Sequence, residues 1–262
     1  MHKSECCKKL RSAVLGAAAL CFLFGAAVSA RTDDVKPAPV RTGYLTKDKA
    51  VDGFALLPPP PAYDSVHFMY DKAMYEYGLA MRNTERGKQA ADDVDEFALQ
   101  RHFSEAFGMD ITPEKMPELF KLVERANEDV YLATVSAKKG YNRVRPYLLY
   151  DAPTCFRPDE ERLRYNSSYP SGHSARAWGV GLILSEINPA RKETIMRRAY
   201  EYGQSRVICG YHWQSDVDAG RLAGAAGAAS LHSNHEFLKQ LQKAKDEFNR
   251  LAKRANKGKF HK

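Results

Sequence analysis

The segment from Pro117 to Gly140 places the strongest constraint on what this chain can fold into. Proline suits the first turn of a helix, and glycine is a natural stop at its end. Between them, apolar residues recur with the period of one helix face, at Leu119, Leu122, Val123, Ala126, Val130, Ala133 and Ala137. The pattern predicts one long amphipathic helix across the whole segment.

Most of the remaining chain has the same helical character. We expect further helices over residues 65–82, 88–107, 172–187, 191–209, 212–231 and about 236–255. Small residues crowd the segment from Gly224 to Ala229, which would allow helices to approach closely there. Convincing alternating strand patterns are absent. The sequence therefore predicts an all-α fold class and a compact multi-helix domain.

Residues 1–30 have the pattern of a signal peptide. A basic start (Lys3, Lys8, Lys9 and Arg11) precedes an apolar run from Ala13 to Val28. The small residues Val28-Ser29-Ala30 predict cleavage after Ala30 and export to the periplasm. The alternative is a membrane anchor, but the apolar run is short for a span and ends in a cleavage-like site.

The mature chain would run from residue 31 to 262, and we expect no membrane span in it. Residues 31–63 are rich in proline and predict an extended arm, because Pro58 to Pro61 favour polyproline geometry. Residues 64–262 predict a single helical domain. The formal net charge is +8, and removal of the leader's four basic residues and one acidic residue leaves +5. This mild, spread charge suits anionic substrates but does not indicate nucleic-acid binding.

The cysteine count favours one disulfide and no metal site. Cys6, Cys7 and Cys21 would leave with the leader, so that only Cys155 and Cys209 remain. An even pair in an exported protein predicts a bridge, with two buried free thiols as the alternative. The chain has no Cys-x2-Cys or His-Glu-x2-His pattern, and we interpret His232 and His235 as surface residues. We expect neither a metal nor another cofactor.

The stretch from Ser205 to Asp216 carries the first chemical signal. His212 and Asp216 are four residues apart, so they would share one face of a helix. The aspartate can accept the N–H of the imidazole and leave its other nitrogen as a nucleophile or base.

Arg206, in the same stretch, falls on the expected buried stripe of Ile195, Ala199 and Tyr202. A cation there needs an anionic partner, and a phosphate matches its planar guanidinium. The alternative is an internal salt bridge with Asp216 or Asp218.

A second block, from Lys138 to Pro146, offers two cations near one loop. Lys138 lies at the end of the long helix, and Arg145 follows the glycine break. Together they could clamp a dianion, although solvated surface charge is the usual role of such residues. We interpret the neighbouring Lys139 and Arg143 as surface cations.

A third block, Tyr169 to Ser174, leads into an apolar helix. Free N–H groups and the dipole of a helix N-terminus bind phosphate. Ser171 could cap this helix and donate to a phosphate oxygen, and His173 would face the same anion. Simple capping would explain Ser171 but not His173.

The three blocks together resemble the signature of the phosphatidic acid phosphatase type 2 superfamily. The matching residues are Lys138-x6-Arg145-Pro146, Pro170-Ser171-Gly172-His173 and Ser205-Arg206-x5-His212-x3-Asp216. Within that superfamily, the leader, the length, the Leu-Pro-Pro-Pro-Pro stretch and the Gly-Tyr-His-Trp-Gln-Ser-Asp run resemble the bacterial class A non-specific acid phosphatases. This closer resemblance covers nearly the whole mature chain.

The resemblance implies an all-helical fold and metal-free hydrolysis of phosphate monoesters through a phosphohistidine. It makes His212 the nucleophile, Asp216 the group that orients it, and His173 the general acid. The residues implied to hold the phosphate are Lys138, Arg145, Ser171, Gly172 and Arg206. It further implies inhibition by vanadate and a homodimer or higher homo-oligomer, and it leaves open phosphate transfer to alcohols as a side activity.

The same site chemistry also leaves other functions open. A lipid phosphatase would need apolar spans that the mature sequence lacks. A vanadate-dependent haloperoxidase would share the anion site, but those enzymes are typically much larger. A non-catalytic anion-binding protein would not need both histidines.

Overall fold

The long helix expected from the sequence is present and organises the structure. The computed structural model describes residues 42–96 and 98–259, and in it α5 spans Pro117–Tyr141. Pro117 stands in its first turn, and Asn142 ends it with a left-handed φ of 43°. The side chains on the apolar stripe from Leu119 to Ala137 are buried, so the periodicity identified the inner face correctly.

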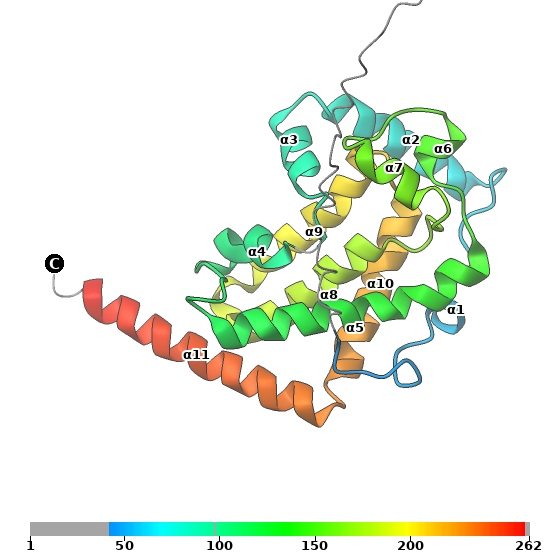
Figure 1. Ribbon diagram of the computed structural model, residues 1–262. Helices are drawn as coiled ribbons and strands as arrows, with labels where there is room; N and C mark the ends of the chain where they lie inside the picture. The colour runs from blue at the N-terminus through cyan, green and yellow to red at the C-terminus, as the bar shows by residue number, and fades with distance from the viewer. Residues whose placement is uncertain (1–41, 97, 260–262) are drawn as a thin grey trace, which may run out of the picture. The chain divides into compact units, whose positions relative to one another are not determined.

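Three further helices pack around each other and α5. They are α8 (Gly172–Ile187), α9 (Lys192–Ile208) and α10 (Gln214–Leu231). α8 contacts all of the other three, and it is therefore buried on most sides (Figure 1). The part of the chain that the structure describes contains helices and no strand, which confirms the all-α prediction.

Small residues let these helices approach closely. A Cβ added at Gly224 of α10 would lie 2.3 Å from the backbone oxygen of Ala175 in α8. A Cβ at Gly179 of α8 would lie 2.8 Å from the backbone oxygen of Gly224. Moving backbone atoms out of such contacts would cost folding free energy. The packing therefore requires the glycine-rich and alanine-rich sequence of α10.

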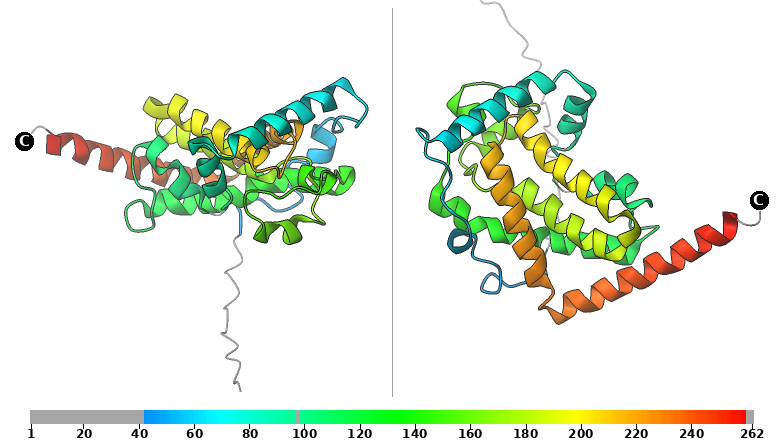
Figure 2. Two further views of the ribbon diagram at one scale, coloured as in Figure 1. Left: turned by 90° about the horizontal axis from the view of Figure 1, so that it is seen from above. Right: turned by 180° about the vertical axis from the view of Figure 1, so that it is seen from behind.

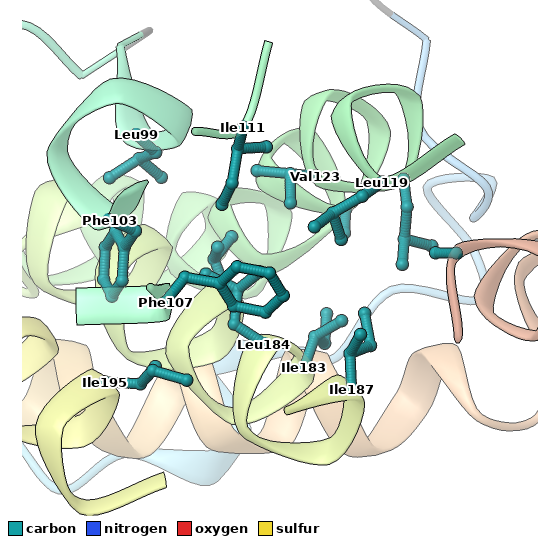
Figure 3. Packing of buried hydrophobic residues seen from close by; sticks show 14 of the residues in the cluster. Leu99, Phe103, Phe107, Ile111, Leu119, Val123, Ile183, Leu184, Ile187 and Ile195 are labelled. Carbon is teal, nitrogen blue, oxygen red and sulfur yellow. The ribbon is translucent and has the colours of Figure 1, made fainter. Parts of the chain in front are cut away.

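The main hydrophobic core lies at the end of the helices that is distant from the three signature blocks. Figure 3 shows α4, α5, α8 and α9 contributing to it. Its buried members include Leu99, Phe103, Phe107, Ile111, Leu119, Val123, Ile183, Leu184, Ile187 and Ile195. A core of this size leaves the opposite ends of the helices free to carry polar groups.

The other elements surround this central group, and Figure 2 shows two of its sides. They are α1 (Gly53–Leu56), α2 (Val66–Met81), α3 (Glu85–Asp92), α4 (Leu99–Phe107), α6 (Pro146–Leu149), α7 (Pro158–Leu163), a 3-10 turn η1 (Pro189–Arg191) and α11 (His235–Lys259). The final helix, α11, packs along α5. The expected helices at 65–82, 191–209, 212–231 and 236–255 correspond to α2, α9, α10 and α11 within a few residues.

The single helix expected over residues 88–107 is wrong, because the structure has two helices there. α3 ends at Asp92, and the carboxylate of Asp93 turns inward and is fully buried. It accepts a hydrogen bond of 2.6 Å from Ser205 Oγ and forms an ion pair with Arg198. The buried carboxylate occupies the break between the two helices, and Val94 and Glu96, which follow it, reach the signature blocks.

The N-terminal part of the chain is described from residue 42 onward. The segment expected to be an extended arm contains one helical turn, α1, capped by Asp52. Beyond it, the hydroxyls of Tyr141 and Tyr169 donate to the backbone oxygens of Leu57 and Pro58, so that this part lies against the helical domain. The signal peptide and its cleavage after Ala30 lie outside the described residues.

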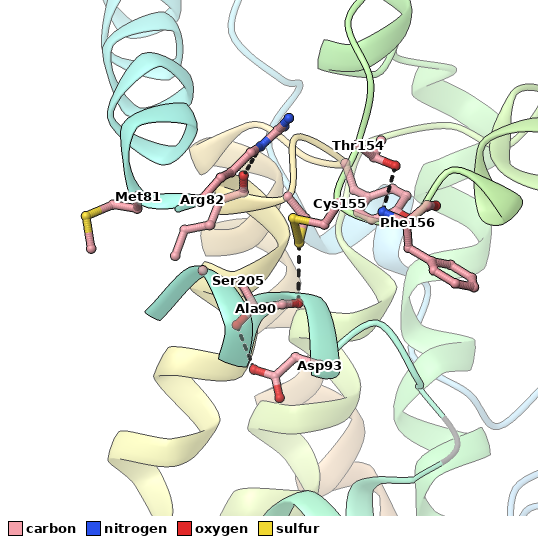
Figure 4. Close-up of a disulfide and its surroundings, with 12 residues drawn as sticks. Met81, Arg82, Ala90, Asp93, Thr154, Cys155, Phe156 and Ser205 are labelled. Carbon is pink, nitrogen blue, oxygen red and sulfur yellow. Dashed lines mark hydrogen bonds between the residues drawn. A yellow bond between two sulfur atoms is a disulfide. The ribbon is translucent and has the colours of Figure 1, made fainter. Parts of the chain in front are cut away.

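Cys155 and Cys209 form the predicted disulfide (Figure 4). The bridge joins the loop before α7 to the end of α9, 54 residues further along the chain. It therefore ties this loop to the block from Ser205 to Asp216, which contains Cys209. Among the described residues, no helix is both long enough and apolar enough to cross a membrane.

We predict that Gly224→Ala destabilises the fold. The new methyl group would push α10 away from the backbone of α8, at an expected cost of about 1–3 kcal/mol in the free energy of unfolding. Urea unfolding at constant pH would measure it. Ala229→Ser, at an exposed position of the same helix, should change stability by about 0.5 kcal/mol or less. Equal stability of the two variants would contradict the close packing described here.

Candidate active site

The site is built around the carboxylate of Asp216, in the first turn of α10. Oδ2 accepts from the backbone N–H of Trp213 at 2.8 Å, from Ser168 Oγ at 2.5 Å and from His212 Nδ1 at 3.3 Å. Oδ1 accepts from Arg143 Nη1 at 2.6 Å. The bond to Trp213 is a helix cap, so the same group starts α10 and fixes the imidazole of His212.

His212 is held at both ring nitrogens. Nδ1 donates to Asp216, and Nε2 lies 3.2 Å from Arg145 Nη1. A guanidinium can only donate, so Nε2 is an acceptor and the imidazole is neutral. Burial, followed by the charges of Arg145 and Lys138, holds the pKa of His212 well below its ordinary value. The structure therefore presents a neutral nitrogen with a lone pair.

Lys138 and Arg145 are buried, so surface charge does not describe them. Lys138 Nζ donates to the backbone oxygen of Ser167 at 2.8 Å. Arg145 donates to the backbone oxygens of Asn166 at 2.9 Å and of Tyr211 at 3.1 Å. Burial lowers the pKa of Arg145 to about 10, with the charge of Arg206 as the next cause. Burial and Arg145 also hold the pKa of Lys138 well below its usual range. Among the residues that the structure describes, no carboxylate forms an ion pair with Lys138 or Arg145, and their hydrogen bonds go to backbone oxygens.

Arg206 is the most exceptional side chain of the site. It is 0 % exposed, and none of its three guanidinium nitrogens has a hydrogen-bond partner among the described residues. The expected alternative of a salt bridge is wrong, because Asp216 pairs with Arg143 and Asp218 pairs with Arg221. The guanidinium lies over the ring of Tyr211, 4.0 Å from its centroid. Buried polar groups are nearly always partnered, so this cation fits a site made for an anion.

The start of α8 brings the third block to the same place. Ser171 is the N-cap, and its Oγ accepts from Ser174 N at 3.3 Å. Gly172 leaves room for a close neighbour, because a Cβ there would lie 2.8 Å from the ring of Tyr131. His173 Nε2 donates to the backbone oxygen of Val94 at 3.0 Å. The free backbone N–H groups of this helix start add donors for an anion.

These groups enclose one small cavity of about 40 Å³. Its lining contains Glu96, Tyr131, Lys138, Arg145, Arg162, Leu163, Asn166, Gly172, His173, Arg206 and His212. Six of the eight residues expected to form the site are among them. Asp216 lies behind His212, and the hydroxyl of Ser171 is engaged with Ser174 rather than lining the cavity. Three buried cations, two imidazoles and a helix N-terminus around a space of this size suit a tetrahedral anion.

The interpretation of Arg143 as a surface cation is wrong. Its side chain is 3 % exposed, and it donates to Asp71 at 2.7 Å as well as to Asp216. Asp71 belongs to α2 and also accepts from the backbone and the hydroxyl of Ser215. Lys139, in contrast, is exposed as expected. Nothing in the sequence around Arg143 distinguishes it from a solvated arginine, because its partner lies 72 residues away.

Sequence reasoning also missed Glu96 and Ser168. Glu96 reaches the cavity only because the chain breaks between α3 and α4, where one continuous helix was expected. Ser168 donates to Asp216 from the loop before α8.

Away from this cavity, Asp92, Asp93 and His102 come together, but Arg101 and Arg198 already pair with the two carboxylates. His232 and His235 are exposed, as expected.

The fold and the site define a helical protein with a cationic, histidine-containing anion site. Residues 129–239 match the PAP2 superfamily. The chain is 55% identical over 213 residues to the non-specific acid phosphatase of Providencia stuartii, covering 80% of this chain and 86% of that protein. It is 44% identical over 209 residues to that of Salmonella typhimurium, covering 79% and 84%. An acid phosphatase of Zymomonas mobilis is 32% identical over 222 residues, covering 84% and 82%.

The chain therefore belongs to the bacterial class A non-specific acid phosphatases of the PAP2 superfamily. It is an enzyme, an acid phosphatase. The resemblance identified from the three sequence blocks is confirmed.

We predict that Arg143→Ala is strongly destabilising, because it leaves Asp71 and Asp216 buried without their cation. Removing one partner of a buried pair costs about 3–5 kcal/mol. Lys139→Ala is the matched control, four residues earlier in the chain and exposed, and it should change the free energy of unfolding by about 0.5 kcal/mol or less. Chemical denaturation with the disulfide intact would compare the two. Similar midpoints would show that Arg143 is not a structural cation.

Proposed function

We propose that this enzyme hydrolyses phosphate monoesters through a covalent phosphohistidine at His212, without a metal ion. The observation that carries the proposal is the buried guanidinium of Arg206. It has no hydrogen-bond partner among the described residues, and it lines the cavity that also contains His212 and His173. A phosphate in that cavity would supply the missing acceptors.

In the first step, His212 Nε2 attacks phosphorus. The new N–P bond forms as the P–O bond to the leaving alcohol breaks, and His173 donates a proton to the departing oxygen. Arg145 gives up its contact with Nε2 and donates to a phosphate oxygen instead. Asp216 accepts the Nδ1–H bond throughout and stabilises the positive charge that develops on the ring.

In the second step, water attacks the phosphohistidine. His173 now accepts a proton from the water, the N–P bond breaks, and phosphate leaves with His212 neutral again. An alcohol that replaces this water would receive the phosphoryl group, and this is the basis of the phosphotransfer side activity that we propose.

The cations supply the stabilisation of the transition state. The equatorial oxygens of phosphorus carry the spreading negative charge, and Lys138, Arg145 and Arg206 surround the space that they would occupy. The backbone N–H of Gly172 contributes a donor from the start of α8, whereas that of Ser171 already donates to the backbone oxygen of Asp216 at 2.8 Å. Vanadate would bind the same groups, because its five-coordinate form resembles the transition state.

We further propose that the protein is exported to the periplasm, is cleaved after Ala30 and forms a homodimer or a higher homo-oligomer. Exposed apolar side chains on α2, namely Val66, Met69, Tyr70 and Tyr77, support an association of two copies.

The first functional prediction concerns the nucleophile. His212→Ala should lower kcat/KM for p-nitrophenyl phosphate by more than about a thousandfold, because no other group would attack phosphorus. His232→Ala, at an exposed histidine, is the control and should retain activity. The wild-type enzyme, quenched in alkali during turnover, should carry phosphate on His212. Vanadate should inhibit competitively. Loss of wild-type activity with a chelator and its recovery with a divalent metal would contradict the metal-free mechanism.

The second functional prediction is an acidic optimum in the pH profile. Burial holds the pKa of both His212 and His173 well below the ordinary value for histidine, with Arg145 and Arg206 respectively as the next cause. kcat/KM should fall at low pH as His212 gains a proton, and at high pH as His173 loses one. The plateau between these two limbs should therefore lie below about pH 6.5, the ordinary pKa of histidine. A profile that keeps rising into alkaline solution would contradict these assignments.

A further inference from the structure

The carboxylate of Glu96 lies beside the imidazole of His173. Glu96 belongs to the turn between α3 and α4, and its side chain is 15 % exposed and lines the anion cavity. Oε2 lies 3.5 Å from His173 Nδ1 and 3.7 Å from Arg176 Nε. Oε1 lies 3.8 Å from Arg162 Nη1. A carboxylate is unexpected in a cavity that otherwise collects positive charge.

The hydrogen bond of Nε2 decides which nitrogen of His173 can exchange a proton. Nε2 lies 3.0 Å from the backbone oxygen of Val94, which can only accept. Nε2 therefore carries a hydrogen in both charge states of the ring. The proton that is gained and lost resides on Nδ1, and this is the side that faces Glu96.

Three cations around His173 oppose its protonation. Arg206 of α9, Arg176 of α8 and Arg145 before α6 are cations, and together with burial they lower the pKa of His173. His212, which follows α9, lies in the same cavity. The ring of Tyr202, also from α9, stacks on His173 with centroids 6.2 Å apart and is neutral. The backbone oxygen of Val94 raises the pKa of His173, and Glu96 brings a carboxylate to 3.5 Å from Nδ1, where a negative charge favours a charged imidazole.

The two histidines have carboxylates of different effective charge. Asp216, beside His212, is neutralised by Arg143 at 2.6 Å. Glu96, beside His173, has its nearest cations at 3.7 Å and 3.8 Å, where compensation is weaker. The pair of sites therefore favours one neutral and one protonated imidazole, which is the arrangement that acid and nucleophile need.

We propose that Glu96 is a positioning residue for the general acid: its carboxylate holds the Nδ1–H of His173 toward the cavity and keeps that imidazole protonated while His212 stays neutral. This inference rests on the proposed function, in which His173 protonates the leaving oxygen. The effect of Glu96 on the rate should depend on the leaving group of the substrate. An alkyl phosphate releases a basic alkoxide that needs the proton, whereas p-nitrophenyl phosphate releases a stable phenolate that needs it less.

The test is the pH profile of kcat/KM for glycerol phosphate and p-nitrophenyl phosphate. Glu96→Gln and Glu96→Ala each remove the charge, and both should move the alkaline limb for glycerol phosphate to lower pH by about one unit. At a pH above the limb, kcat/KM should therefore be about tenfold lower than in the wild type. The p-nitrophenyl ester should lose less. Glu96→Asp keeps the charge, so its alkaline limb should lie close to that of the wild-type enzyme. A merely structural role would lower activity without moving the limb.

Glu128→Gln is the matched control. Glu128 contacts Arg176 Nη1 at 3.4 Å, as part of the same charge cluster, but it does not contact His173, so the limb should stay in place. An unmoved limb in both charge-removing variants would overturn the inference.

His173→Asn separates this failure from that of the proposed function. If His173→Asn lowers activity on glycerol phosphate far more than on p-nitrophenyl phosphate, while the Glu96 variants behave as wild type, only the role of Glu96 is wrong. If His173→Asn shows no such preference, the assignment of the acid is itself wrong.

Discussion

The double ion pair of Arg143 is the interaction on which the rest of the structure depends. Its guanidinium joins Asp71 of α2 to Asp216 of α10, and all three groups are buried. Because Arg143 neutralises Asp216, that carboxylate can orient His212 without forcing a proton onto it. The same bridge connects α2 to the beginning of α10, next to His212. Structure and chemistry therefore share one set of bonds, and a change at Arg143 affects both.

The cavity shows the opposite electrostatic situation. Lys138, Arg145 and Arg206 are buried close together, and they are stabilised by backbone oxygens or by a tyrosine ring rather than by carboxylates. Such crowding costs folding free energy, which the core of α4, α5, α8 and α9 must offset. In return, the donors are fixed before the anion arrives and need no reorganisation.

Most of the fold and much of the site could be predicted from the sequence. Helical periodicity located α5 to within one residue. The three blocks, through the family resemblance that they carry, named six of the residues that line the cavity. The errors have a common cause. Arg143, Asp93 and Glu96 each depend on a partner that lies 72 or more residues away, and local patterns carry no information about it. A buried carboxylate ended α3 where the apolar pattern alone indicated one continuous helix.

The break between α3 and α4 makes substitution at Glu96 and substitution at Asp216 differ in their effect on the fold. Asp216 caps a core helix, so almost any substitution there would disturb the fold as well as the nucleophile. Glu96 lies in the connection between α3 and α4 and starts no helix, so its replacement does not remove a helix cap. In the mechanism that we propose, variation at Glu96 would adjust the acid side of the reaction while the side of His212 and Asp216 stays unchanged. Enzymes with this scaffold could adapt to environments of different acidity through a few residues of one connection.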